Sequence, residues 1–80
     1  MSPVERRNTV READRLLRKG RVRESLLSYD RAGAAPSYSQ LMESGNACLA
    51  AGETREAVAA FVRAGLVGTP KRRDRRGVRQ

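Results

Sequence analysis

Eighty residues with no histidine and a single cysteine leave few kinds of chemistry open to this chain. A chain this short forms one small domain, whose core contributes only about 3 to 5 kcal/mol unless a disulfide, a metal or a second subunit adds to it. The composition excludes a zinc site built from Cys and His, a His-assisted nucleophile and an intramolecular disulfide. We therefore expect no metal and no cofactor.

The net charge of +8 is distributed unevenly along the chain. Residues 6–37 carry nine basic and four acidic side chains, residues 38–70 carry two and three, and residues 71–80 carry six and one. No apolar run is long enough for a signal peptide or a membrane span. Together with the single thiol, this predicts a cytoplasmic protein without membrane insertion. Fifteen arginines against two lysines point to a bacterial genome of high GC content.

The sequence predicts a first pair of helices between Ser2 and Gly33. Ser2 and Glu5 form a capping box, Pro3 suits the first helical position, and Gly20 supplies the turn that ends the first helix. The apolar positions that recur at helical spacing are Val10, Ala13, Leu16 and Leu17 in the first helix, and Val22, Leu26 and Tyr29 in the second.

A second pair of helices is expected after Pro36. Ser37 and Gln40 form another capping box, and Gly52 is the expected turn between the two helices. The apolar positions of this pair are Leu41, Gly45, Cys48 and Leu49, followed by Ala57, Val58, Phe61 and Ala64. The last helix is expected to end at the residues that follow, Gly65, Gly68 and Pro70. No stretch alternates apolar and polar residues as a strand does, so the predicted fold class is all-α, with four antiparallel helices.

The two pairs are copies of one unit, because residues 19–33 recur at residues 51–65 with an offset of 32. Six of the fifteen paired positions are identical, whereas average residue usage predicts about one. The identical pairs are Gly20/Gly52, Arg23/Arg55, Glu24/Glu56, Arg31/Arg63, Ala32/Ala64 and Gly33/Gly65. The chain is therefore predicted to contain two stacked helix-turn-helix repeats.

These units resemble the tetratricopeptide repeat. The positions that match its signature are Leu41, Gly45, Cys48, Gly52, Ala57, Phe61 and Ala64 in the second unit, and Leu16, Gly20, Tyr29 and Ala32 in the first. The resemblance covers residues 6–70, with Ser44 in place of a large apolar residue and an offset shorter than the usual length of about 34 residues. It implies an α-α superhelix over residues 1–69, in which Gly45 and Ala57 allow helices to approach closely.

The resemblance also implies a function, because such repeats bind a peptide or partner protein in a concave groove lined by the first helix of each unit. The groove positions carried over are Arg7, Val10, Asp14, Leu17 and Arg18 from the first unit, and Ser39, Met42, Asn46, Leu49 and Ala50 from the second. We expect a scaffold or adaptor with an acidic partner. The subtype that grips the terminal carboxylate of a chaperone is rejected, since Met42 replaces its lysine and no third unit is present.

Clustered arginines leave a second function open. The arginines along one face of the first helix, which either contact phosphates or form a solvated face beside Glu12 and Asp14, are Arg7, Arg11, Arg15 and Arg18. Residues 70–80 are expected to form a disordered basic tail that either binds nucleic acid or lipid phosphates or only keeps the chain soluble. Its basic residues include Lys71, Arg72, Arg73, Arg75 and Arg76. A nucleic-acid-associated protein is therefore the alternative function.

No arrangement of residues predicts an enzyme. Cys48 lies on an apolar helix face, which is typical of a small core residue, and Glu53 and Glu56 are expected to be ordinary surface charges. Two repeats without a polar capping helix leave apolar surface on the last helix. We therefore expect a homodimer formed through the uncapped helices, or docking onto a larger partner. A truncated remnant of a longer repeat protein is the competing interpretation.

Overall fold

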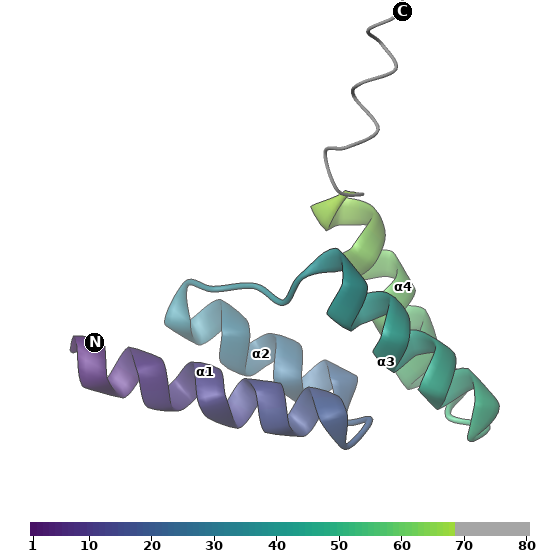
Figure 1. Cartoon of the computed structure of the whole chain (residues 1–80), viewed down its shortest axis with the longest axis horizontal. Coiled ribbons are helices and arrows are strands. Elements are labelled where there is room, and N and C mark those ends of the chain that lie inside the picture. The colour runs from purple at the N-terminus through teal and green to yellow at the C-terminus, as the bar shows by residue number, and fades with distance from the viewer. Residues whose placement is uncertain (69–80) are drawn as a thin grey trace, which may run out of the picture.

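The computed structural model describes residues 1–68, and over this range the chain forms four helices and no strands (Figure 1). The helices are α1 (Pro3–Arg18), α2 (Val22–Ala32), α3 (Tyr38–Ala50) and α4 (Thr54–Val67). The predicted all-α class is thus confirmed for residues 1–68. The predicted domain boundary after residue 69 and the basic tail with Lys71, Arg72, Arg73, Arg75 and Arg76 lie outside the described residues.

The four helices form two hairpins. α1 packs along α2, α3 packs along α4, and α2 and α4 are in contact where the hairpins meet. Figure 1 shows that the second hairpin crosses the first at a steep angle, with the two short interhelical turns on the same side of the molecule.

Local sequence signals explain where the helices begin. The Ser2 hydroxyl accepts a hydrogen bond from the Glu5 amide at 3.2 Å, and the Glu5 carboxylate accepts one from the Ser2 amide at 2.9 Å. Ser37 and Gln40 form the same box at the start of α3, at 3.1 and 2.8 Å. Both predicted capping boxes are confirmed, and each satisfies two amides that lack an acceptor within the helix.

The two interhelical turns are copies of each other. Gly20 and Gly52 adopt φ of 83° and 81°, a left-handed conformation that is strained for any residue with a Cβ. The amide of Arg21 donates to the carbonyl of Leu16 at 2.9 Å, and the amide of Glu53 donates to the carbonyl of Cys48 at 2.8 Å. These bonds satisfy carbonyls that the helix ends leave free.

Small residues let the helices of each hairpin approach closely. Gly45 on α3 faces the ring of Phe61 on α4, and a Cβ at Gly45 would lie 2.5 Å from a ring carbon. In the first hairpin, Ser25 is fully buried, and its hydroxyl donates to the carbonyl of Ala13 at 2.8 Å. The predicted close approach at Gly45 is confirmed, and buried hydroxyl groups bond to helix backbone.

The structure makes two expectations about the second hairpin more exact. Of the residues expected to end α4, Gly65 lies inside the helix, and Gly68 ends it after Val67. Leu49 and Val58, predicted on the apolar face, leave 56% and 53% of their surface exposed. Periodicity identifies apolar positions but does not tell which of them a neighbouring element covers.

Two glycine-to-alanine substitutions are expected to change stability in opposite directions. Gly65→Ala should raise the free energy of unfolding by about 0.5 to 1 kcal/mol, because a Cβ there meets open space and alanine favours the helix. Gly45→Ala should lower it by about 1 kcal/mol, because the Phe61 ring must move. Urea titration followed by circular dichroism measures both, and equal effects would contradict the packing described for Gly45.

Candidate functional site

An open groove lies between α1 and α3, beside the two interhelical turns. Its volume is about 730 Å³, which lies in the range of ligand-binding clefts. Its lining residues are Asp14, Leu17, Arg18, Lys19, Gly20, Arg21 and Glu24 from the first hairpin, and Gln40, Glu43, Ser44, Ala47, Cys48, Ala51, Glu53 and Glu56 from the second. Both α1 and α3, the first helices of the two hairpins, contribute residues to it.

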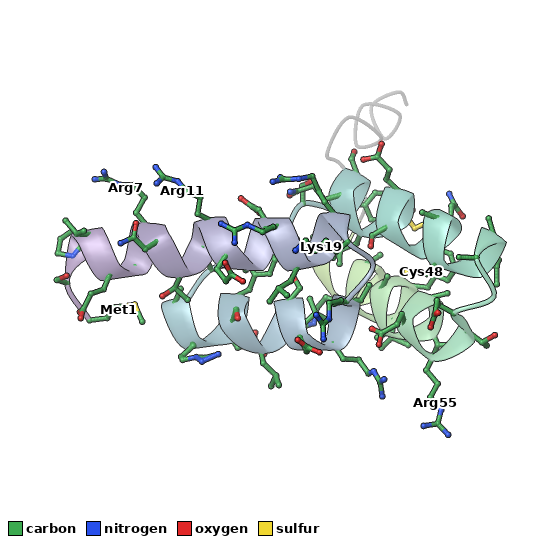
Figure 2. The ribbon with its side chains drawn as sticks, turned by 90° about the horizontal axis from the view of Figure 1, so that it is seen from below. Met1, Arg7, Arg11, Lys19, Cys48 and Arg55 are labelled. Atoms are coloured by element: carbon green, nitrogen blue, oxygen red, sulfur yellow. The ribbon has the colours of Figure 1, made fainter. Side chains whose placement is uncertain are left out.

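Three of the predicted groove residues, Asp14, Leu17 and Arg18, line this groove. Two others from α1 do not line it: Arg7, near the start of that helix (Figure 2), and Val10, in its middle, border a separate hollow beside Met1. α1 thus contributes only its second half to the groove.

On α3 the groove wall differs from the prediction by about one residue in register. Met42 is partly buried against the core, and Asn46 and Leu49 are exposed but do not line the groove. The wall is formed instead by Gln40, Glu43, Ala47 and Ala51, each of which follows one of the predicted positions Ser39, Met42, Asn46 and Ala50. A shift of one residue rotates a helical position by about 100°, which is enough to move a side chain to another face.

The lining carries both signs of charge, with five acidic and three basic side chains. Two of the acids have partners within the chain: Glu24 pairs with Arg21 at 3.2 Å, and Glu56 pairs with Arg23 at 3.0 Å. Within residues 1–68, no ion pair is formed by the lining residues Arg18, Lys19, Glu43 and Glu53. Two free bases at the end of α1 therefore lie opposite two free acids of the second hairpin.

Asp14 is held by a tyrosine beneath the groove. The hydroxyl of Tyr29, which is only 1% exposed, donates to the Asp14 carboxylate. Burial first, and then this hydrogen bond, raises the pKa of Tyr29 far above its ordinary value. Tyr29 consequently stays protonated and fixes Asp14 on the groove wall across the physiological pH range.

The floor of the groove consists of side chains that bond to the backbone of the first hairpin. The Ser44 hydroxyl donates to the carbonyl of Leu17 at 3.2 Å, and the Cys48 thiol lies 3.6 Å from the carbonyl of Gly20. Burial raises the pKa of the Cys48 thiol, which is 3% exposed. Cys48 is thus a buried core residue, as predicted, and its raised pKa disfavours the reactive thiolate.

Glu56 joins the hairpins and was missed by the sequence analysis, which treated it as a surface charge. Its carboxylate accepts hydrogen bonds from the Arg23 amide at 2.9 Å and from the Arg23 guanidinium at 3.1 Å. The amide bond is the main cause that lowers the pKa of Glu56, and the guanidinium adds to it. The carboxylate therefore acts as the N-cap of α2, whose own cap residue, Arg21, forms no side-chain bond.

Arginines on the outer side of α1 divide into two groups. Arg15 pairs with Glu12 at 2.9 Å, whereas Arg7 and Arg11 project from the helix into solvent (Figure 2). Arg6 instead turns toward α2, where its Nε donates to the carbonyl of Ala32 at 2.8 Å. The arginine face thus has three exposed cations, Arg7, Arg11 and Arg18, that form no ion pair within residues 1–68.

Acidification is expected to weaken the contact between the hairpins through Glu56. Because the folded state lowers the pKa of Glu56 below its ordinary value of 4.5, its stabilising effect is present above that pH and is lost as the pH falls below it. Glu56→Gln should lower the free energy of unfolding at neutral pH by about 1 to 2 kcal/mol and reduce its dependence on acid. Denaturant titrations between neutral pH and pH ~3 measure this.

The matched control is Glu53→Gln, which removes an exposed glutamate without an ion pair near the same turn. This variant is expected to retain the acid dependence of the unmodified chain. An identical response of the two variants would contradict the capping role of Glu56.

Within residues 1–68, no helix is both long and apolar enough to cross a membrane. The same range contains no cluster of three or more Cys, Asp or Glu side chains that is arranged to hold a metal ion. Comparison of the chain with protein-family models, with curated proteins and with solved structures finds no match.

Proposed function

We propose that this chain is a two-repeat, tetratricopeptide-like module that binds a segment of a partner protein in the groove between α1 and α3. The repeat offset, the two hairpins and the contribution of each first helix to the groove support this proposal. The single observation that carries it is a groove of about 730 Å³ with unpaired charges of both signs on its walls. Such charges orient a bound segment and select its sequence.

Small side chains on α3 provide room for the ligand. Ala47 and Ala51 lie exposed in the lining, so the helix backbone is accessible to side chains of a partner. A partner side chain that packs on these alanines gains apolar contact, while polar neighbours such as Gln40 offer hydrogen bonds. The α3 wall is therefore the surface on which an extended or helical segment rests.

The charges of the lining favour a segment that carries both signs. Arg18 and Lys19 are placed to attract an acidic residue, and Glu43 and Glu53 are placed to attract a basic one. Because acids outnumber bases in the lining, we propose a mixed segment with at least one basic residue, whereas the sequence led us to expect a partner of acidic character.

The groove is tested by Ala47→Arg with Asn46→Arg as its matched control. Peptides selected from a displayed random library against the full chain should carry both charges, and Ala47→Arg should weaken their binding about tenfold or more. Asn46→Arg adds the same charge one residue away, outside the groove, and should leave the affinity nearly unchanged. Calorimetry measures both affinities; peptides that bind the two variants equally would refute the groove as the site.

A nucleic-acid-associated protein is the second candidate, favoured by the exposed Arg7 and Arg11 on one face of α1. If this face contacts phosphates, affinity for a DNA duplex should fall steeply with salt, and Arg7→Gln with Arg11→Gln should reduce the slope by about 2. Fluorescence anisotropy over a salt series measures the slope. Binding that is absent at low salt, or unchanged in the double variant, would exclude this face.

A further inference from the structure

The contact between the hairpins uses residues that the repeat supplies twice. Glu56 of the second unit binds Arg23 of the first, and the repeat offset makes Arg55 equivalent to Arg23 and Glu24 equivalent to Glu56. The internal contact therefore uses the arginine of one unit and the glutamate of the next. The two equivalent residues that this contact leaves unused, Glu24 of the first unit and Arg55 of the second, remain at opposite ends of the two-unit array.

The two unused residues are exposed. Arg55 projects into solvent on the side of the molecule opposite to Arg7 and Arg11 (Figure 2). Glu24 pairs only with its neighbour Arg21, and both side chains are more than half exposed, so that pair contributes little. Glu24 and Arg55 are thus available to another molecule.

The backbone around Arg55 repeats that around Arg23. The residues before α2 and α4, Arg21 and Glu53, have φ/ψ of −92°/66° and −89°/72°, and neither helix has a side-chain cap from its own N-cap residue. Glu56 supplies the cap of α2. The corresponding position on α4 has the same shape and the same arginine.

Apolar surface surrounds this position. Leu17 and Leu26 of the first unit are 4% and 8% exposed, whereas their equivalents in the second unit, Leu49 and Val58, are 56% and 53% exposed. The second hairpin follows the first, but within residues 1–68 no third hairpin follows the second. We call this surface the end face; it consists of Leu49, Arg55, Val58, Val62 and Leu66, and the last two are 60% and 77% exposed. Contiguous apolar side chains of this kind mark an interaction surface.

We propose that the end face binds the first hairpin of a second copy of this chain, with Glu24 of that copy on Arg55. The proposal goes beyond peptide binding in the groove, because it concerns the end face and a different partner. Glu24, on the other side of the contact, also belongs to the groove lining. Two observations favour a second copy as the partner. The charges are complementary, and the contact repeats the one that Arg23 and Glu56 make between the two hairpins. Leu27 of the second copy, 65% exposed on α2, supplies apolar surface to the same contact.

Part of the internal contact is not repeated between copies. Asp30 pairs with Arg63 inside the chain at 3.2 Å, but the equivalent of Asp30 in the second unit is Val62. On the other side of the contact, the buried Ser44 corresponds to the exposed Glu12. The association therefore rests mainly on α4 of one copy and α2 of the next, and is weaker than the contact between hairpins.

Because the two contacting surfaces differ, the arrangement is head-to-tail, and each added copy exposes a new end face. The average mass should therefore rise above the 8.8 kDa of one chain and continue to rise with concentration. A symmetric dimer through two end faces would instead stop at twice the mass of one chain.

Charge reversal tests this arrangement on the full chain by sedimentation velocity. Arg55→Glu and Glu24→Arg should each return the mass to that of one chain, because each places like charges together. An equimolar mixture of the two variants should associate again, since every contact then joins opposite charges. Arg11→Glu is the matched control, with the same charge change on an exposed arginine of α1, and should associate like the unmodified chain.

Several outcomes would overturn the proposal. One is an unmodified chain that remains a monomer at all concentrations. Another is normal association of Glu24→Arg, which a symmetric contact between end faces predicts. Failure of the mixture to associate would also refute it, provided that circular dichroism shows both variants to be folded. Loss of peptide binding in the groove with association intact would instead refute only the proposed function.

Discussion

The carboxylate of Glu56 at the start of α2 is the contact on which the arrangement of the hairpins depends. It binds the backbone amide and the guanidinium of Arg23 at once, and so provides the cap that the first turn of α2 lacks. The first turn of α2 is thus capped by a side chain of the second hairpin. This contact fixes α4 beside α2, and with the bonds from Ser44 and Cys48 to the first hairpin it sets the width of the groove.

Most of the fold follows from local signals in the sequence. The boxes at Ser2 and Ser37 and the left-handed turns at Gly20 and Gly52 require only a few neighbouring residues, so the four helices were predictable. The helical conformation of Gly65 was not predictable, because Gly65 matches Gly33 in the repeat. Gly33 leads into the connection to the second hairpin and ends α2, whereas apolar residues follow Gly65 and the helix continues. Identical residues therefore take different backbone conformations when the chain beyond them differs.

The site was predictable only in part, because its walls depend on how two hairpins meet. Asp14, Leu17 and Arg18 were placed in the groove from the sequence, but Met42, Asn46 and Leu49 do not line it. Helical periodicity leaves the rotation of α3 against α1 undetermined to within one position. The repeated Arg-Glu dipeptide at residues 23–24 and 55–56 was visible from the start. Only the structure shows that the arginine of the first repeat unit, Arg23, binds the glutamate of the second unit, Glu56.

Hydrogen exchange of two backbone amides tests the central claim most directly. The amides of Arg23 and Arg55 occupy the same position in the first turns of α2 and α4, where the helix provides no acceptor. The Arg23 amide donates to Glu56, whereas the Arg55 amide has no acceptor within residues 1–68. In dilute solution at neutral pH, after correction for intrinsic rates, Arg23 should therefore exchange more slowly than Arg55. Equal exchange rates at the two positions would show that Glu56 does not cap α2, and the account of the hairpin contact would be wrong.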